Sequence, residues 1–413
     1  MTKLIRKAME NKNKLIYLDY NSTTPVDRRV VDAMLPYFYD HPGNAASHHH
    51  AYGWAAEDAV DQARKQVADL INVSAKELVF TSGATESNNL AIKGVFQTYQ
   101  SKGKHIVTVK TEHKAVLDAC LAVEKMGGEV TYLEVDEEGL VNLDLLAEAI
   151  RPDTVLVSIM WANNETGVIQ PMEAIGKVCA EQNTLLMSDA TQAVGKIPIF
   201  PKEAGVHLLS CSAHKLYGPK GVGALYVSNR QPRVKIGAQI VGGGHEEGMR
   251  SGTLNVPGIV GFGKSAALAK TEMAKEAERL AKLRNRLETA LLELPEVYRN
   301  GPASPRLPQV SNLSFKYIKG EALMMAFKEE LAVSSGSACT SANPDPSHVL
   351  LSMGISENMA EAALRFSLGR FTTTEQIDRS IEVVKKAVAK VRAESPAWQL
   401  FQDGVDLAPM GWA

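Results

Sequence analysis

A lysine that follows an apolar run offers the most distinctive covalent chemistry in this sequence. Lys215 comes shortly after the predicted strand His207–Ser210, has Ser212 and His214 beside it, and precedes a Gly-Pro-Lys-Gly turn at residues 218–221. Taken alone, a loop lysine is usually a solvated ammonium group. A lysine in a partly desolvated site loses its proton more readily and can form a Schiff base. We therefore predict a catalytic role for Lys215.

An aspartate at another strand end extends this hypothesis. Asp189 follows the apolar residues Leu186 and Met187, at the carboxyl end of a predicted strand where ligand-facing residues belong. An aspartate in this position often only caps the next helix. Its alternative role is a counter-charge for a protonated heterocycle.

A turn that suits an anion lies earlier in the chain. In Phe80–Ser87 a strand ends, Gly83 turns the chain and a helix opens near Thr85. Free N–H groups at a helix start, with the Thr85 hydroxyl, can bind a phosphate, although an ordinary strand-to-helix turn would have the same sequence. A nucleotide is not indicated, because neither nucleotide-binding glycine pattern is present. A phosphate site, a counter-charge and a Schiff-base lysine together predict pyridoxal 5'-phosphate (PLP) as cofactor.

Two further residues are predicted to face the same crevice. His113 follows the predicted strand His105–Val109, and Asn164 follows the predicted strand Thr154–Met160. A histidine stacked on the cofactor ring could restrain it and transfer protons near neutral pH, whereas a capping or surface histidine is the alternative. The Asn164 amide offers hydrogen-bond donors.

Cys339 and Arg365 complete the residues with candidate chemistry. Cys339 lies in a glycine- and serine-rich stretch, which predicts a mobile, accessible loop at residues 334–346 in which a thiolate could reach a bound substrate. An incidental loop cysteine is the alternative. Arg365 lies in a strand pattern and suits bidentate capture of a carboxylate, with a surface ion pair as the alternative.

Composition narrows the class of protein. The chain has 413 residues, of which 22% are charged, and a formal net charge of −2. This balance argues against a nucleic-acid partner, and no apolar run reaches the ~20 residues that span a bilayer. Residues 1–14 contain five basic side chains but no apolar core of a signal peptide. We interpret this stretch as a frayed tail, with a mitochondrial presequence as the alternative, and expect a cytoplasmic protein. The run His48–His50 is interpreted as a solvated loop, and no metal site is predicted.

The predicted elements place these residues on an α/β fold. Apolar strand runs alternate with helical patterns, which is typical of a mostly parallel sheet covered by helices on both faces. The seven predicted strands are Leu78–Thr81, His105–Val109, Val130–Leu133, Thr154–Met160, Thr184–Ser188, His207–Ser210 and Gly223–Val227.

A long charged helix at 259–294 and three later strand patterns indicate a second, smaller unit. We expect a large PLP-binding domain at 15–260 and a smaller α+β domain at 261–413, which carries the cysteine loop and against which residues 1–14 could pack.

Together these segments resemble the cysteine desulfurases of the NifS/IscS group, over nearly the whole chain. The most specific stretches are Ser82–Ser87, Thr111–Val116, Asp189–Gln192, His214–Gly221, Arg250–Thr253, Ser334–Ala342 and Arg365–Thr373. The resemblance implies a homodimer with the fold-type I architecture of PLP-dependent transferases. This sequence departs from the pattern of the family at Glu247, where relatives often carry arginine.

By the same resemblance each residue takes a role. Lys215 binds the cofactor covalently, Asp189 pairs with its ring nitrogen and His113 stacks on the ring. Substrate binding falls to Arg365 and Asn164. Cys339 takes sulfur from L-cysteine as a persulfide, leaving L-alanine. The other implied cofactor contacts are Gln192, Asn164, Ala84, Thr85, Ser212, His214 and, from the neighbouring subunit, Thr253.

The resemblance also implies partners. The loop at 334–346 matches the branch that passes sulfur to acceptor proteins, among them an iron–sulfur scaffold protein, so Cys339 would at most contact a cluster transiently. The tail from Ser395 to Ala413 resembles one that docks the scaffold through Trp398, Phe401 and Trp412, unless these pack on their own domain. A selenocysteine lyase or an aminotransferase of the same fold is the alternative function.

Overall fold

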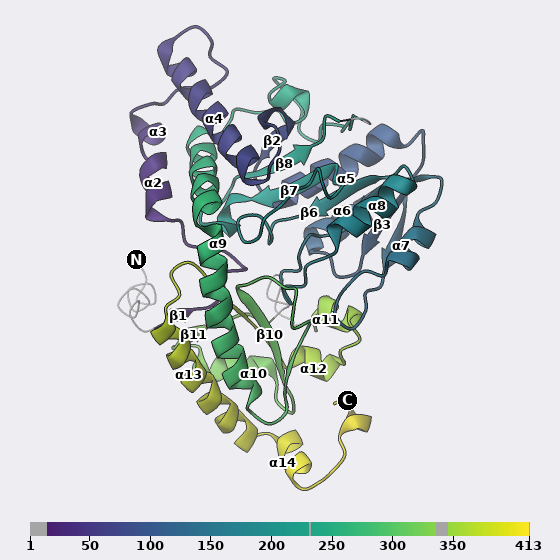
Figure 1. Cartoon of the computed structure of the whole chain (residues 1–413), viewed down its shortest axis with the longest axis vertical. Helices are drawn as coiled ribbons and strands as arrows, with labels where there is room; N and C mark the ends of the chain where they lie inside the picture. Colours follow the sequence, from purple (N-terminus) through teal and green to yellow (C-terminus); the bar gives the residue numbers. More distant parts are fainter. Residues whose placement is uncertain (1–14, 231–232, 336–345, 413) are drawn as a thin grey trace.

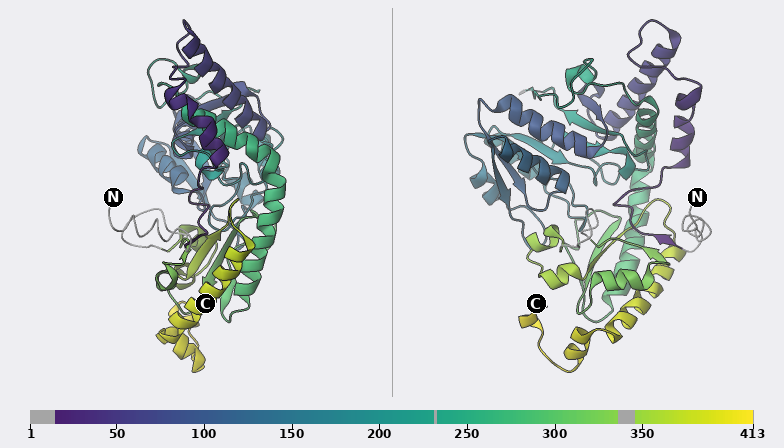
Figure 2. Two further views of the ribbon diagram at one scale, coloured as in Figure 1. Left: turned by 90° about the vertical axis from the view of Figure 1, so that its left-hand side faces the viewer. Right: turned by 180° about the vertical axis from the view of Figure 1, so that it is seen from behind.

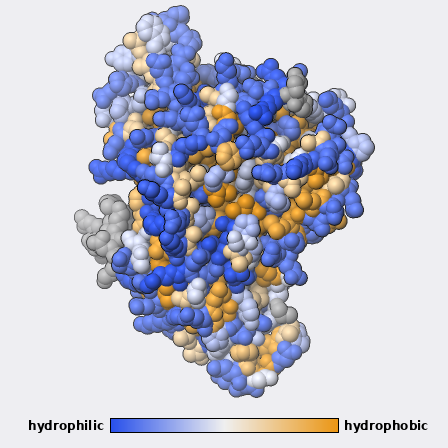
Figure 3. Space-filling model, in the orientation of Figure 1, coloured by the Kyte–Doolittle hydropathy of each residue, from blue (hydrophilic) through white to orange (hydrophobic). Residues whose placement is uncertain are grey.

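The computed structural model describes residues 15–230, 233–335 and 346–412. Figure 1 shows a larger α/β part above and a smaller part below, joined by a long helix. Figure 3 shows that the same face has hydrophilic margins and apolar residues across its middle.

A seven-stranded sheet forms the centre of the larger part. Its order is β2-β8-β7-β6-β5-β3-β4, and only β8 runs antiparallel to its neighbours. The mostly parallel sheet predicted from the sequence is therefore confirmed, with strand ends shifted by at most two residues. The strands are β2 (Leu78–Thr81), β3 (His105–Val109), β4 (Glu129–Leu133), β5 (Thr154–Ser158), β6 (Leu185–Asp189), β7 (Leu208–Ser212) and β8 (Gly223–Val227).

Helices cover both faces of this sheet, because alternate strand residues point to opposite sides. Ile106 and Leu156 pack toward α5 and α6, whereas Val107 and Val157 belong to the core on the other face. Burial on both sides explains the uninterrupted apolar runs of the strands. The covering helices are α4 (Ala51–Leu70), α5 (Ala84–Tyr99), α6 (Lys114–Lys125), α7 (Leu143–Ala149) and α8 (Met172–Glu181).

The long helix α9 (Val256–Leu292) connects the two parts. Its first half contributes Phe262 and Ala266 to the core of the larger part, and its second half contributes Leu283 and Leu287 to a separate core. Figure 2 shows the helix running past both parts along one edge of the molecule. Among the described helices, none is long and apolar enough to cross a membrane.

The smaller part is built on a three-stranded antiparallel sheet with β10 in its centre. A short parallel pair, β1 with β11, brings Ile16 and Leu18 into the same core. The segment that starts at residue 15 therefore contributes to the smaller core before it enters the larger part, and the domain bounds remain a prediction. The strands are β1 (Ile16–Tyr17), β9 (Val297–Arg299), β10 (Val310–Phe315), β11 (Leu331–Ala332) and β12 (Ala363–Ser367).

The remaining described helices lie mainly at the margins. They are α2 (Arg28–Met34), α3 (Pro36–Tyr39), α10 (Gly320–Phe327), α11 (His348–Ser352), α12 (Glu357–Glu361), α13 (Thr374–Ala393) and α14 (Pro396–Gln402).

Aromatic side chains of the tail pack back onto the smaller part. The ring of Tyr317 stacks on Phe401 at 4.7 Å and lies 6.1 Å from Trp398 and 5.4 Å from Trp412. The guanidinium of Arg392 covers Trp398 at 4.1 Å. These aromatic residues therefore contact their own chain, while part of each side chain stays exposed.

Replacing Leu287 tests whether α9 supports the smaller core. Leu287 is fully buried in that core, so Leu287→Ala should lower the free energy of unfolding by about 3 kcal/mol. Lys282→Ala on the exposed face of the same helix should change it by less than about 0.5 kcal/mol. Denaturant unfolding monitored by circular dichroism measures both, and equal midpoints would contradict the placement of Leu287.

Candidate active site

The carboxyl ends of the parallel strands meet at one edge of the sheet, where a cavity of about 540 Å³ opens. Ligands of open α/β sheets bind at this edge. The cavity is large enough for a small cofactor together with a substrate. The predicted site residues that line it are Ala84, Thr85, His113, Asn164, Asp189, Gln192, Ser212, His214 and Lys215.

One end of the cavity favours an anion. Helix α5 begins there, and Gly83 precedes it without a capping side chain, so the N–H groups of the first turn remain available. Lys220 lines the same cavity. Burial, followed by the charges of Lys215, Lys220 and Lys196, lowers the pKa of His214 to about 4. The histidine is therefore neutral near pH 7 and lies in a field of positive charge.

A close backbone approach shapes this end. A Cβ atom at Gly223, the first residue of β8, would lie 2.6 Å from the Cα of Gly83. Glycine at position 223 therefore lets the turn before α5 pack directly against the sheet.

Asp189 also lines the cavity, lies at the last position of β6 and is 5% exposed. Its Oδ2 accepts a hydrogen bond of 2.7 Å from the Asn88 amide, and its Oδ1 accepts one of 2.9 Å from the Thr191 N–H. These two donors fix the direction of the carboxylate. The aspartate is not a helix cap, because no α-helix begins after it.

Two buried oxygens beside Asp189 call for a polar ligand. Oγ1 of Thr191 and Oε1 of Gln192 have no hydrogen-bond partner within the described part of the chain. Unsatisfied buried polar atoms are costly, so they are expected to bond a ligand. With the start of α5, the Asp189 carboxylate and Lys215 all lining one cavity, the residues present fit PLP.

The side chain of Lys215 is held by an N-terminal segment. Its Nζ donates hydrogen bonds of 2.6 Å and 2.7 Å to the carbonyl oxygens of Asn21 and Ser22. The Gln192 amide donates to the same Asn21 carbonyl at 2.9 Å. Sequence reasoning missed this segment, although a polar run directly after the apolar residues Ile16–Leu18 could have indicated it.

His113 lines the cavity and also caps a helix. Its Nδ1 accepts a hydrogen bond of 3.1 Å from the N–H of Ala115 in the first turn of α6. Burial lowers the pKa of His113, so the ring is neutral near pH 7. Because Nδ1 is occupied as an acceptor, the proton of the neutral ring lies on Nε2. His113 is therefore a helix cap that also lines the cavity, and its stacking on a cofactor ring remains a prediction.

Glu112 is a second residue that the sequence did not indicate. Its side chain is fully buried, and its Oε1 accepts a hydrogen bond of 2.6 Å from the N–H of Met160. Burial, reinforced by the Asp189 charge, raises the pKa of Glu112 well above its usual range. Burial therefore disfavours a second ionised carboxylate beside Asp189. A glutamate directly before the candidate histidine was the available clue.

Arg365 borders the cavity from the smaller part and is 4% exposed. Its Nη2 donates to Oδ1 of Asp19 and to the Ser22 hydroxyl, both at 2.9 Å, and its Nη1 donates to the Asn164 carbonyl at 3.2 Å. Ser22 and Asn164 both line the cavity. The arginine therefore forms a buried ion pair at the cavity edge, not the surface pair that was the alternative.

Thr253 and Cys339 are the predicted residues that remain to be located. Thr253 is exposed and does not line the cavity, as expected if it acts in a neighbouring subunit. Cys339 lies outside the described residues.

The described flanks of the Cys339 segment do reach the site. Ser334 and Arg365 exchange backbone hydrogen bonds of 3.2 Å and 2.7 Å. On the other flank, the Ser347 hydroxyl donates to Glu165 at 2.6 Å, and Nε2 of His348 lies 3.0 Å from the Glu112 carbonyl. Both ends of the segment are therefore attached to residues at the cavity.

The histidine run at 48–50 has a local structural role. Nδ1 of His50 accepts a hydrogen bond of 3.1 Å from the Gly53 N–H at the start of α4, and His48 lies 3.4 Å from Glu57. Within the described ranges, no group of three or more histidine, cysteine, aspartate or glutamate residues is arranged to hold a metal ion.

Comparison with known proteins defines the class first. Residues 16–379 match the class-V aminotransferase family. Among particular proteins, the chain is 58% identical to cysteine desulfurase IscS of Anaeromyxobacter sp. (strain Fw109-5), over 96% of this chain and 98% of that protein. It is 55% identical to cysteine desulfurase IscS of Glaesserella parasuis serovar 5 (strain SH0165), with the same coverage.

Solved structures agree with these sequence matches. A NifS-like protein superposes with a TM-score of 0.85 at 37% identity, over 91% of this chain and 99% of that one. SspA in complex with cysteine superposes with a TM-score of 0.76 at 35% identity, over 86% and 99%. The chain belongs to the cysteine desulfurases of the class-V aminotransferase family, which confirms the resemblance and the fold class predicted from the sequence.

The three described cysteines should be unreactive in the native protein. Cys120, Cys179 and Cys211 are buried, and burial raises the pKa of each thiol to about 12. At about pH 8 almost none of each is thiolate, the form that reacts. Brief treatment with iodoacetamide followed by peptide mass spectrometry should therefore modify Cys339 alone, whereas unfolded protein should be modified at all four. Equal labelling of any buried cysteine would contradict its burial.

Proposed function

We propose that this protein is a PLP-dependent cysteine desulfurase that moves sulfur from L-cysteine to Cys339 and then to acceptor proteins. The observation that carries the proposal is the single cavity that Lys215 and Asp189 share with an anion-binding end. Arg365 bonds the carbonyl of Asn164, which lines that cavity, and the flanks of the Cys339 segment bond Arg365 and Glu165, next to Asn164 in sequence. Membership in the cysteine desulfurase family supports the same reaction.

The cofactor would be held at both ends of the cavity. Thr85, Ser212 and His214, with the first turn of α5, would bind its phosphate, and Asp189 would pair with its ring nitrogen. Gln192 and Asn164 would face its ring oxygen, and His113 would lie over the ring with Nε2 as donor. When bound through Lys215, PLP supplies an electron sink that lets a carbon–sulfur bond of the substrate break.

Arg365 would bind the substrate carboxylate. Its guanidinium is already oriented by Asp19, Ser22 and the Asn164 carbonyl, and its buried Nε has no hydrogen-bond partner within the described residues. A fixed, planar guanidinium suits two parallel hydrogen bonds to a carboxylate. Asn164 would border the same substrate.

Cys339 would receive the sulfur. Its thiolate attacks the sulfur of cysteine, the sulfur–sulfur bond of a persulfide forms, and the carbon–sulfur bond breaks. The carbon keeps the electron pair and takes up a proton, which leaves alanine, so atoms and electrons balance. Cys339 follows Ser334 by five positions, and a chain of this length extends at most about 18 Å. The attachment of Ser334 to Arg365 therefore keeps the cysteine within reach of the substrate.

The assembly is part of the same proposal. Phe38, Tyr39, Tyr52 and Trp54 are more than half exposed, near the start of the larger part, and such a group of large aromatics suits the interface of a homodimer. Thr253 would then complete the phosphate site of the neighbouring subunit. Acceptors would include an iron–sulfur scaffold protein docked near the tail. The cytoplasmic location expected from the sequence also remains a proposal.

Replacing Cys339 tests the sulfur-transfer step. Cys339→Ala should abolish persulfide and sulfide production from cysteine, because the accepting sulfur is lost, while the yellow chromophore of the bound cofactor stays. Cys120→Ala, which removes a buried thiol in the middle of α6, should keep turnover within about twofold. Unchanged turnover in Cys339→Ala would contradict the desulfurase assignment and favour an aminotransferase or a lyase that needs no such thiol.

Replacing Lys215 tests the covalent attachment of the cofactor. After reduction with borohydride, the native protein should carry the cofactor on the peptide that contains Lys215, detected by mass spectrometry. Lys215→Ala should lose this adduct and lower turnover at least about a thousandfold, because the only covalent link is gone. An adduct on another lysine in the native protein would refute the assignment of Lys215, whatever the activity.

A further inference from the structure

The turn that carries Lys215 is held in an unusual backbone conformation. Tyr217, two residues further on, has φ of 63°, a region that side chains other than glycine rarely adopt. Such a conformation persists only where its surroundings impose it. The contacts made by Tyr217 therefore decide where the preceding lysine points.

The backbone of Tyr217 is bound on both sides by the N-terminal segment. Its N–H donates to the Thr24 hydroxyl at 2.8 Å, and its carbonyl accepts from the Asp27 N–H at 3.0 Å. The Thr24 hydroxyl in turn donates to the carbonyl of His214 at 2.9 Å. The turn is thus paired with the same segment whose carbonyls hold the Lys215 ammonium.

The side chain of Tyr217 is clamped by Arg370. The guanidinium carbon lies 4.2 Å from the centre of the Tyr217 ring, and the backbone N–H of Arg370 donates to the Tyr217 hydroxyl at 2.5 Å. The phenol is 3% exposed, and burial raises its pKa well above its usual range, so the ring stays neutral. A cation over a buried ring is held more strongly than one at the surface.

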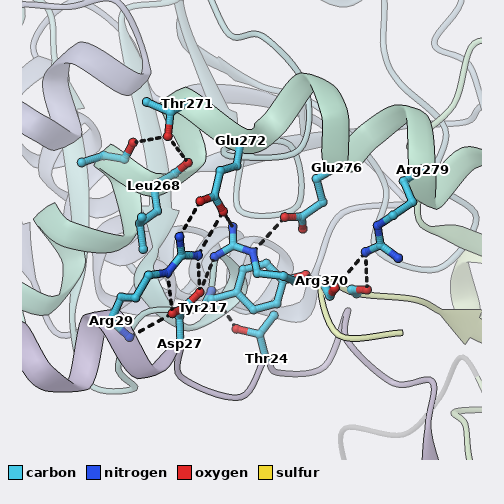
Figure 4. Close-up of polar contacts among 12 residues, drawn as sticks. Thr24, Asp27, Arg29, Tyr217, Leu268, Thr271, Glu272, Glu276, Arg279 and Arg370 are labelled. Carbon is cyan, nitrogen blue, oxygen red and sulfur yellow. Dashed lines mark hydrogen bonds and ion pairs between the residues drawn. The ribbon is translucent and has the colours of Figure 1, made fainter. Parts of the chain in front are cut away.

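Carboxylates hold the guanidinium in this position (Figure 4). Nε donates to Glu276 of α9, and Nη1 donates to Asp27, both at 2.8 Å. Asp27 is the residue whose N–H pairs with the Tyr217 carbonyl, so Arg370 contacts the Lys215 turn both directly and through Asp27. Removing the guanidinium would leave Asp27 and Glu276 without this shared cation.

Arg370 also lies close in sequence to the predicted substrate clamp. It follows Arg365 by five residues, beyond the end of β12. Nη2 of Arg279 in α9 donates to the Arg370 carbonyl at 2.8 Å, and Nη1 donates to the Thr372 carbonyl at 2.7 Å. The smaller part therefore places Arg370 firmly against a turn of the larger part.

We propose that Arg370 is a positioning residue for Lys215, which it aims into the cavity by clamping Tyr217 and binding Asp27. The inference rests on the proposed function, because it assigns the cofactor link to Lys215. It predicts that losing the clamp reduces formation of that link and turnover, while cysteine binding at Arg365 is unaffected.

The test uses the holoenzyme and three substitutions near the turn. Arg370→Met removes the guanidinium with its side-chain hydrogen bonds to Glu276 and Asp27. Arg370→Lys keeps a cation without the planar fork, and Tyr217→Leu removes the ring that the guanidinium covers. Arg286→Met is the matched control, because Arg286 lies on the exposed face of α9 and pairs with Asp378 of α13. For each protein, kcat and KM for cysteine, the fraction of cofactor trapped on Lys215 by borohydride, and the thermal midpoint are measured.

We expect Arg370→Met to lower kcat at least about tenfold, with KM within about twofold and a reduced trapped fraction. Arg370→Lys should recover part of kcat, and Arg286→Met should match the native protein. Native-like kcat and trapping in Arg370→Met overturn the inference. The inference is also overturned if kcat falls only in proportion to the fraction of unfolded protein, because Arg370 would then have a structural role only.

If Arg370→Met does not fold, Tyr217→Leu decides, because it removes the ring that the guanidinium covers: native-like kcat and trapping overturn the inference. Absence of the Lys215 adduct from the native protein refutes the proposed function instead, so the two failures are distinguishable.

Discussion

The ammonium of Lys215 is held by two carbonyl oxygens that lie 194 and 193 residues earlier in the chain, and the rest of the site depends on this contact. The Asn21 carbonyl also accepts from Gln192, and the hydroxyl of Thr23 lies 3.1 Å from Nδ1 of His214. Asp19, just before this segment, pairs with Arg365. One short N-terminal segment therefore connects the candidate cofactor residues with the candidate substrate clamp.

This segment can do so because it is anchored at both ends. Before it, Ile16 and Leu18 are buried in the smaller core through the pairing of β1 with β11. After it, Asp27 is bound to Arg370, and the neighbouring Arg29 pairs with Glu272 of α9. A buried carboxylate that is left without its cations is costly, so these ion pairs hold the two parts of the molecule in one relative arrangement. Arg365 of the smaller part is thereby held next to Ser22 and Asn164, which line the cavity.

Sequence reasoning reached the sheet and the strand-end residues, but not the contacts between distant segments. Most strands were predictable because burial on both faces gives every strand of the seven-stranded sheet except the edge strand β4 a largely apolar sequence. Asp189 and Lys215 were found because they lie at the ends of such runs. Asp19 and Asn21 were missed because β1 has two residues and no periodic pattern. Glu112 was missed because only its burial makes it unusual.

The burial of Glu112 bears on how the cavity discriminates between ligands. An ionised carboxylate beside Asp189 would add a second negative charge in a buried site, and the mutual repulsion would be several times larger than in water. Burial and the Asp189 charge raise the pKa of Glu112 and so oppose that second charge, while Lys215, Lys220 and Lys196 place positive charge near His214. The cavity therefore has negative charge at Asp189 and positive charge near His214. A ligand with a cationic ring nitrogen at one end and a phosphate at the other matches that polarity, whereas a ligand of uniform charge would be repelled at one of the two ends.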